Sequence, residues 1–141
     1  MRFEADVLIE GPHHKQIAVI EVKNQLGLSV DHGRLRLAYM RLSGGPARCF
    51  MLASQDVAFI WRDGEEQPTV VSMEPVIRRY LPDLAAEERL YGFQVETLIL
   101  HWLNELVAGW RTGTGEPEST LAAIGFLDAV RNGTVHSKAV A

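Results

Sequence analysis

The chain has 141 residues, of which 47% are hydrophobic and 23% charged, a balance that is ordinary for a soluble globular protein with a real core. Its net charge of −4 argues against a general nucleic-acid coat protein, and the lack of any run of about eighteen uncharged apolar residues argues against a membrane span. Cys49 is the only cysteine, so no intrachain disulfide can form. The first residues lack the apolar core of a signal peptide, and we therefore expect a cytoplasmic protein with no membrane partner.

Alternating apolar and polar residues predict a β-hairpin at the start of the chain. Its strands cover residues 3–10 and 16–24, with a turn between them that contains Gly11 and Pro12. One face of the first strand carries only apolar side chains, which are Phe3, Ala5, Val7 and Ile9. The opposite face is largely acidic and holds Glu4, Asp6, Leu8 and Glu10.

A helix and three more strands are expected after the hairpin. The helix begins after Ser29 or Asp31, either of which can serve as its N-cap, and it ends near Leu42, before a Gly-Gly-Pro sequence. Its expected buried face follows the i, i+3, i+4, i+7 spacing and consists of Leu35, Ala38, Tyr39 and Leu42. The further strands are predicted at residues 48–53, 57–62 and 69–72.

The second half of the chain is predicted to be helical, with helices at residues 74–81, 94–110 and 118–131. The longest has an apolar stripe made of Val95, Leu98, Ile99, Trp102, Leu103, Leu106 and Trp110. We therefore expect one α/β domain with a mixed β-sheet and helices packed on it. It covers residues 1–133, with a sheet-rich core at 1–72, a helical part at 73–133 and a flexible tail at 134–141.

The second predicted strand carries two charged residues at the end of an apolar run. Glu21 and Lys23 share one face with Val19, whereas Ile20 and Val22 face the other way. Charged residues are rarely built into an apolar strand without a partner or a function. An acid and an amine held about 7 Å apart on rigid backbone, at the edge of a core, fit a catalytic site.

The length of the turn sets the register of the hairpin. A four-residue loop pairs Gly11 with Gln16 and puts Asp6 opposite Glu21. A five-residue loop would turn the Asp6 carboxylate toward the core face, so the shorter loop is preferred. Two carboxylates whose Cβ atoms are about 5 Å apart repel each other unless a cation lies between them. Lys23 or a hydrated Mg²⁺, which takes one or two carboxylates, would meet this need.

An Asp on one strand, a Glu-x-Lys sequence on the next and a helix after them resemble the PD-(D/E)xK nuclease superfamily, the restriction-endonuclease-like fold. The matching residues are Asp6, in Ala-Asp-Val-Leu-Ile, and Glu21 with Lys23, in Glu-Val-Lys-Asn. Gln25 stands two residues past the lysine, where some members carry a glutamine. The resemblance covers about residues 3–53, and Ala5 stands where a proline often precedes the acid.

The resemblance implies Mg²⁺-dependent hydrolysis of phosphodiester bonds in DNA, with Mn²⁺ as an alternative ion. Asp6, Glu21 and the backbone carbonyl of Val22 would hold the metal, which polarises the phosphate and lowers the pKa of a bound water. Lys23 would orient that water or offset charge on the phosphorane. Gln25 would contact water or phosphate.

A basic segment indicates where a polyanion would bind. Residues 32–55 contain no acid but carry four arginines, whereas residues 63–90 are rich in acids. Arg34 and Arg41, seven residues apart on one helical face, would contact the DNA backbone. The alternative is that these arginines only solvate the surface of a helix.

The family core resembles α-β-β-β-α-β, and its first helix and first strand have no counterpart before Asp6. Either the sequence covers part of such a domain, or a partner chain supplies them, or the helix at 94–110 fills the space and offers Glu96 or Glu105 as a further acid. Two other classes of function stay open. One is a catalytically inactive interaction or regulatory module of the same fold, for which a homodimer is credible. The other is a helix-rich oligomerisation protein in which Glu21 and Lys23 are only paired charges.

Overall fold

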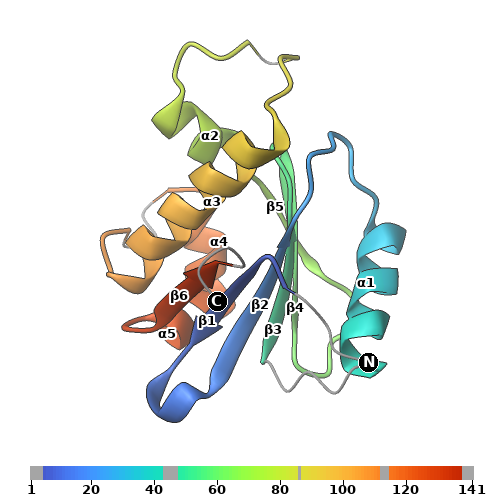
Figure 1. Ribbon diagram of the computed structural model, residues 1–141, viewed down its shortest axis with the longest axis vertical. Helices are drawn as coiled ribbons and strands as arrows, with labels where there is room; N and C mark the ends of the chain where they lie inside the picture. The colour runs from blue at the N-terminus through green and yellow to red at the C-terminus, as the bar shows by residue number, and fades with distance from the viewer. Residues whose placement is uncertain (1–4, 43–47, 86, 112–114, 138–141) are drawn as a thin grey trace.

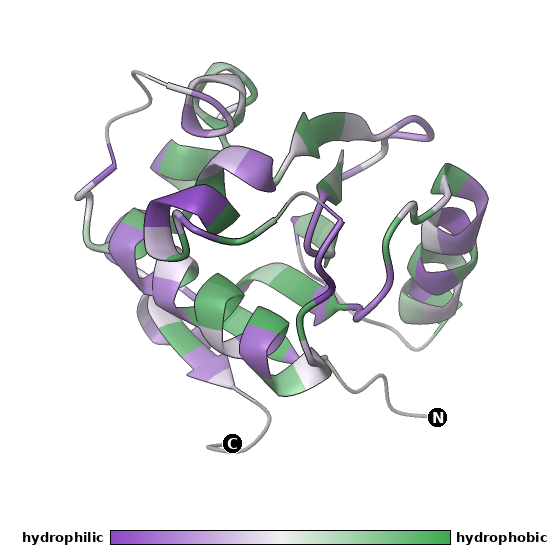
Figure 2. Ribbon diagram, turned by 90° about the horizontal axis from the view of Figure 1, so that it is seen from above, coloured by the Kyte–Doolittle hydropathy of each residue, from purple (hydrophilic) through white to green (hydrophobic). Residues whose placement is uncertain are grey.

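The computed structural model describes residues 5–42, 48–85, 87–111 and 115–137. A six-stranded mixed sheet in the order β5-β4-β3-β2-β1-β6 forms its centre, as expected for the predicted α/β class. Figure 1 shows helix α1 on one face of this sheet and α2 to α5 on the other, and Figure 2 shows the same two layers from above. The strands are β1 (Val7–Glu10), β2 (Gln16–Val22), β3 (Cys49–Ala53), β4 (Val57–Arg62), β5 (Thr69–Ser72) and β6 (Thr134–Ser137). The helices are α1 (Val30–Leu42), α2 (Glu74–Tyr80), α3 (Gly92–Val107), α4 (Glu118–Ala123) and α5 (Phe126–Val130).

The hairpin of β1 and β2 has the predicted register along most of its length. Val7 lies opposite Ile20 and Ile9 opposite Ala18. The register then shifts at the end of the ladder, so that Glu10 rather than Gly11 pairs with Gln16, and the prediction for that pair is wrong. The shift leaves Ile17 as an extra residue in β2, a β-bulge next to the short 3₁₀ turn at Pro12–His14.

The first strand is shorter than predicted, since β1 begins at Val7 rather than at residue 3. Residues 1–4, which include Phe3 and Glu4, lie outside the described part of the chain. Val7 and Ile9 are fully buried, as their predicted face requires.

The connection from β2 through α1 to β3 places two parallel strands side by side. Residues 18–22 of β2 pair in parallel with residues 49–53 of β3, and β4 and β5 continue the sheet antiparallel. The predicted N-cap is confirmed, because Ser29 Oγ accepts a hydrogen bond from the His32 N–H at 3.2 Å. Helix α1 begins at Val30, a few residues after β2 ends at Val22. The strand end that carries Glu21 and Lys23 is thus followed directly by the crossover to α1.

Helix α1 turns a different face toward the sheet from the one predicted. Its buried residues are Gly33, Leu37 and Met40. The predicted face is wrong, since Leu35 and Leu42 are 71% and 88% exposed. The physical reason is a close approach of the helix to Trp61, because a Cβ at Gly33 would lie only 2.3 Å from that buried ring.

Replacing Gly33 with alanine is expected to lower the free energy of unfolding by about 1–3 kcal/mol, because the added methyl must displace the Trp61 ring. The measurement is urea denaturation followed by Trp fluorescence. Leu35→Ala, at an exposed position of the same helix, serves as a control with an expected change within about 0.5 kcal/mol. A Gly33→Ala protein as stable as the wild type, or more stable, would contradict this account of the packing.

The main hydrophobic core lies between the sheet and α3. The predicted stripe is confirmed for five of its residues, which are Val95, Ile99, Trp102, Leu103 and Leu106. Trp110 was also placed in the core and this is wrong, because α3 ends at Val107 and Trp110 is 74% exposed. None of the helices in the described residues has the length and apolar character that a membrane span requires.

The predicted helix at residues 118–131 is interrupted and forms α4 and α5. Gly125 separates them with a φ of 83°, a left-handed conformation that favours glycine. The resulting turn lets both Leu121 of α4 and Phe126 of α5 face the core, with exposures of 0% and 1%.

The end of the chain forms a strand where a flexible tail was predicted. Strand β6 pairs antiparallel with β1, from Val7 opposite Ser137 to Glu10 opposite Thr134. The predicted tail at 134–141 is therefore wrong for residues 134–137, and residues 138–141 lie outside the described part. Since α3 also packs on β6 and β2, elements from the end of the chain complete the sheet beside β1 (Figure 1).

Candidate functional site

Asp6 lies just before β1, at the point where the hairpin ladder ends. Its Oδ2 accepts a hydrogen bond from the backbone N–H of Val22 at 2.8 Å. Continuing the pairing of Val7 with Ile20 by one residue places Asp6 opposite Glu21. The carboxylate thus replaces the backbone carbonyl of a neighbouring strand as the acceptor for the Val22 N–H.

Glu21 is buried in β2 and faces α1, with its side chain only 4% exposed. Arg36 of α1 grips it through two nitrogens, since Nε lies 2.8 Å from Oε2 and 3.1 Å from Oε1 and Nη2 also donates to Oε1. This hydrogen bonding raises the pKa of Arg36; burial opposes the rise, and the charges of Glu21 and Asp6 add to it. Asp6, Glu21 and Arg36 therefore act on one another electrostatically.

Lys23 directly follows the end of β2 and is half-buried. Its backbone N–H donates to the carbonyl of Ala53 at 2.9 Å, which extends the pairing of β2 with β3 and fixes the position of this residue. Gln25 is exposed and lies beyond the end of the strand. The structure thus brings Asp6, Val22 and Glu21 together and holds Lys23 at the same end of β2.

The two arginines predicted to bind nucleic acid lie elsewhere on α1. Arg34 forms an ion pair with Asp31 at 3.2 Å and donates to Gln67 Oε1 at 2.7 Å. Arg41 donates to the carbonyl of Glu65 at 3.3 Å. Both therefore contact the loop at residues 63–68 and not Glu21.

Sequence reasoning missed Arg36 as a member of the site. The signal was present, since Arg36 lies within one turn of Gly33 and next to Leu37, and these two residues define the buried face of α1. An arginine beside that face points at the sheet and requires an acidic partner. Glu21 is the acid on the facing strand.

The oxygen donors at this site suit a divalent ion, but they are engaged in the structure. Within the described residues, no group of three or more His, Cys, Asp or Glu side chains is arranged to hold a metal. The predicted set needs two carboxylates, from Asp6 and Glu21, and the carbonyl of Val22, and such hard oxygen ligands fit Mg²⁺. Because Arg36 binds both oxygens of Glu21, a metal ion would compete with Arg36 for this carboxylate.

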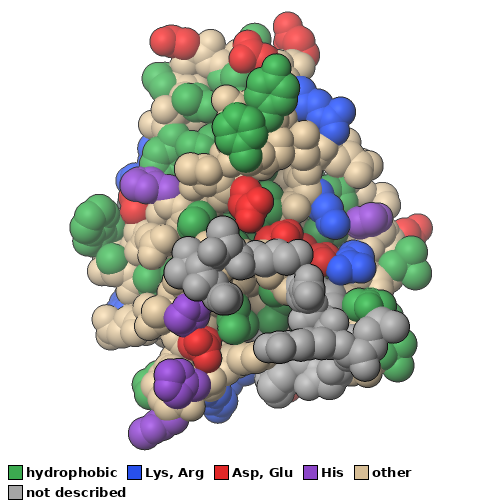
Figure 3. Space-filling model, viewed as in Figure 1, with side chains coloured by type: hydrophobic (Ala, Val, Ile, Leu, Met, Phe, Trp, Pro, Cys, Tyr) green, Lys and Arg blue, Asp and Glu red, His purple; other side chains and the backbone are tan. Residues whose placement is uncertain are grey.

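Charged side chains gather near the middle of the face seen in Figure 3. Acidic and basic groups lie next to each other there, between α1 and α3, and hydrophobic side chains stand above them over the start of α3. This surface combines a charged centre with a hydrophobic group on one side of it.

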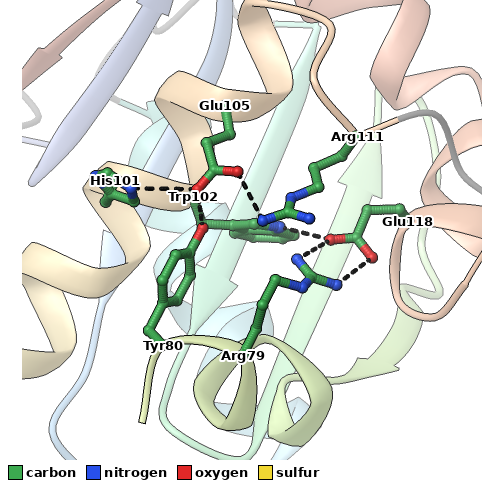
Figure 4. Close-up of polar contacts among 7 residues, drawn as sticks. All are labelled: Arg79, Tyr80, His101, Trp102, Glu105, Arg111 and Glu118. Carbon is green, nitrogen blue, oxygen red and sulfur yellow. Dashed lines mark hydrogen bonds and ion pairs between the residues drawn. The ribbon is translucent and has the colours of Figure 1, made fainter.

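A second cluster of charged residues lies on the opposite side of the sheet, between α2, α3 and α4 (Figure 4). Glu118 is 3% exposed, binds Arg79 at 2.8 and 3.2 Å, and accepts a hydrogen bond from Trp102 Nε1 at 2.9 Å. Burial raises the pKa of Glu118, but the hydrogen bonds from Arg79 and Trp102 outweigh it and the pKa is lowered. This pair joins α2 to α4 across the core.

Glu105 of α3 is the other acid of this cluster. It accepts a hydrogen bond from the Tyr80 hydroxyl, and it lies 2.8 Å from Arg111 and 3.2 Å from His101. Glu105 therefore lies on the other side of the sheet from Glu21 and is bound by three partners. It does not join Asp6 and Glu21, and the suggestion from the sequence that it could be a further acid of that site is wrong.

Tyr80 is expected to ionise late in a spectrophotometric titration of the folded protein. Burial, followed by its hydrogen bond to Glu105, raises its pKa to about 12. Because an unfolded tyrosine ionises near pH 10, the stability that Tyr80 contributes is present below about pH 10 and is lost as the pH rises toward about 12. Tyr80→Phe should remove the late component of the absorbance change, and an unchanged titration curve would contradict this assignment.

Comparisons of the chain with protein-family models, with curated proteins and with solved structures found no match. Function is therefore argued from the residues of the site and their chemistry.

Proposed function

We propose that the protein is a Mg²⁺-dependent nuclease that hydrolyses phosphodiester bonds in DNA, with Asp6, Glu21 and Lys23 at its centre. The observation that supports this most is the 2.8 Å hydrogen bond between the Val22 N–H and the Asp6 carboxylate. It joins an acid before one strand to the Glu-x-Lys sequence of the next, the combination on which the resemblance to PD-(D/E)xK nucleases rests.

The order of the elements supports the same proposal. Strands β1 and β2 are antiparallel, α1 crosses over, and β3 returns parallel to β2. Strand β6 takes the edge beside β1 and α3 packs on the same part of the sheet. In this proposal, elements from the end of the chain would take the places of the first strand and helix that have no counterpart before Asp6.

The residues of the chain have separate roles in the proposed reaction. When bound, Mg²⁺ would polarise the phosphate and lower the pKa of a coordinated water. Asp6 and Glu21 supply negatively charged oxygens for it, and Arg36 fixes the orientation of Glu21. Lys23, on the same face as Glu21, offers an ammonium group that offsets the negative charge developing on the phosphate. Gln25 is exposed beyond the end of β2, and in this proposal it would contact substrate or water.

A second candidate is a catalytically inactive module of the same architecture that serves assembly or regulation. The observation in its favour is the bidentate contact of Arg36 with Glu21, which satisfies the buried acid without any metal. In the third class, a helix-rich oligomerisation protein, Glu21 and Lys23 are only paired charges and are expected to point away from Asp6. The hydrogen bond that the Val22 N–H donates to the Asp6 carboxylate argues against that arrangement, because it holds Asp6 beside Glu21.

Conversion of supercoiled plasmid DNA, measured across a titration of Mg²⁺ and of Mn²⁺, tests the first candidate against the second. We expect cleavage by the wild type that requires the metal and is lost in Asp6→Ala. Absence of cleavage at every metal concentration, from a protein with native circular dichroism, would favour the inactive module. Equal cleavage by wild type and Asp6→Ala would point to a contaminating nuclease.

A further inference from the structure

Two aromatic side chains at the start of α3 are unusually exposed. Tyr91 and Phe93 are each 70% exposed, their rings are parallel to within 4°, and their centroids lie 6.0 Å apart. Large hydrophobic side chains are normally buried, and a pair that is stacked and exposed is informative. The hydrophobic group at the start of α3 in Figure 3 lies directly above the charged centre of that face.

Hydrogen bonds connect the backbone around Tyr91 to Asn24, which lies just beyond the end of β2. With its amide oriented to satisfy both neighbours, Asn24 donates to the carbonyl of Leu90 at 2.7 Å and accepts from the Gly92 N–H at 3.2 Å. Arg89 also donates to the carbonyl of Asn24. Tyr91 lies between these two contacts, and Asn24 directly follows Lys23, so the backbone that carries the rings lies next to the end of β2.

The loop that carries the rings is held firmly. Gln55, which is 7% exposed, donates to the carbonyl of Glu88 at 2.6 Å and accepts from the Leu90 N–H at 2.8 Å. The Tyr91 N–H donates to Gln94 Oε1 at 2.9 Å and closes the first turn of α3. Because the backbone is already ordered, a ligand that stacks on the rings loses little affinity to ordering of the protein.

We propose that Tyr91 and Phe93 form a stacking platform for an unpaired base of the DNA strand whose phosphodiester group lies at Lys23 and Glu21. This rests on the proposed function and names its substrate class, which is single-stranded DNA or a duplex with unpaired ends. A flat nucleic-acid base can stack on a parallel pair of aromatic rings, and each of the four bases has a flat π-face that can do so. Base pairs inside an intact duplex are stacked on each other and cannot use the platform.

The chemistry of the loop favours a base over other occupants. Two rings are far too small for the roughly 800 Å² that each partner buries in a stable protein interface. Glu87 and Glu88 directly precede Arg89, so the loop gives no net attraction to an anionic membrane or to phosphates. The contribution of the rings to DNA affinity is therefore expected to come from stacking and to depend little on salt.

Fluorescence anisotropy with end-labelled oligonucleotides tests this in EDTA, where the proposed metal-dependent cleavage cannot occur. Phe93→Ala and Tyr91→Ala are each expected to weaken binding of a single strand by roughly 5- to 150-fold, the range for loss of one stacked base. Binding of a blunt duplex should change far less, and Phe93→Tyr should bind like the wild type. Trp110→Ala, which removes an equally exposed ring elsewhere, should leave both affinities unchanged.

The outcomes separate this proposal from the proposed function. Unchanged single-strand affinity in both alanine variants, or an equal loss for single strand and duplex, would overturn the platform, while cleavage of plasmid that depends on Asp6 would still stand. Loss of single-strand affinity in a protein that never cleaves would keep the platform and remove the nuclease. A change in sedimentation rather than in DNA binding would show that the rings join two copies of the chain, which also overturns the platform.

Discussion

Replacing Lys23 with alanine is expected to reduce metal-dependent cleavage of DNA by at least about 100-fold, the usual loss when one group that stabilises charge in the transition state is removed. The fold should be retained, because the contact that fixes this residue comes from its backbone N–H, which donates to Ala53 at 2.9 Å. The loss should fall mainly on kcat, since the developing charge that Lys23 offsets is present only in the transition state.

Single-turnover cleavage of an end-labelled strand at saturating Mg²⁺ measures this effect, with circular dichroism as the check of folding. Lys15→Ala is the matched control, because Lys15 is an exposed lysine in the turn of the same hairpin. Lys23→Arg should recover part of the rate if charge at this position is what matters. Cleavage by a folded Lys23→Ala protein at the wild-type rate would remove Lys23 from the mechanism.

Replacing Arg79 with methionine is expected to lower the free energy of unfolding by about 3–5 kcal/mol, because it leaves the Glu118 carboxylate buried without its main partner. The side chains in this pair are 26% and 4% exposed. The neighbouring Arg78 pairs with Glu74 at the surface, where exposures are 62% and 56%, and Arg78→Met should cost only about 0–1 kcal/mol.

Urea denaturation of both variants compares the two pairs on the same helix. Because the folded-state pKa of Glu118 is lowered, the stability due to this pair is present above the ordinary pKa of a glutamate, about 4.5, and is lost as the pH falls through the folded-state value. The difference between wild type and Arg79→Met should therefore shrink in acid. Equal costs for Arg78→Met and Arg79→Met at neutral pH would contradict the role assigned to the buried pair.

Much of the fold follows from short-range patterns in the sequence. Alternation of apolar residues fixed which side of β1 and β2 meets the core, and the cost of burying Asp6 selected the register that pairs Val7 with Ile20. The period of α3 identified its buried stripe because Val95, Ile99 and Trp102 are all large and apolar. Such features depend on neighbours in the chain and on burial alone.

Other features depend on contacts that no local pattern carries. The buried face of α1 begins at Gly33, a residue without a side chain, and its position depends on the close approach to Trp61 in a distant strand. Strand β6 is short and polar, and it forms because β1 offers it an open edge. The sequence reasoning therefore assigned Leu35 to the core and residues 134–137 to a tail, and both assignments are wrong.

The candidate site was predictable only where it depends on strand pairing, and not where it depends on a distant contact. Asp6 and Glu21 could be brought together from hairpin register, because strand pairing follows simple geometry. Arg36 could not, because its direction depends on how far α1 is rotated about its axis. That contact matters for function, since it determines whether Glu21 is available to a metal ion.

Titration of the protein with Mn²⁺ in an isothermal calorimeter, without DNA, tests most directly whether Asp6 and Glu21 form a metal site. We expect the wild type to bind one ion per chain, Asp6→Ala to lose that binding, and Arg36→Gln to bind more tightly because Glu21 is released from its partner. Absence of a bound ion in both the wild type and Arg36→Gln, with each protein folded, would contradict the metal site and the nuclease with it.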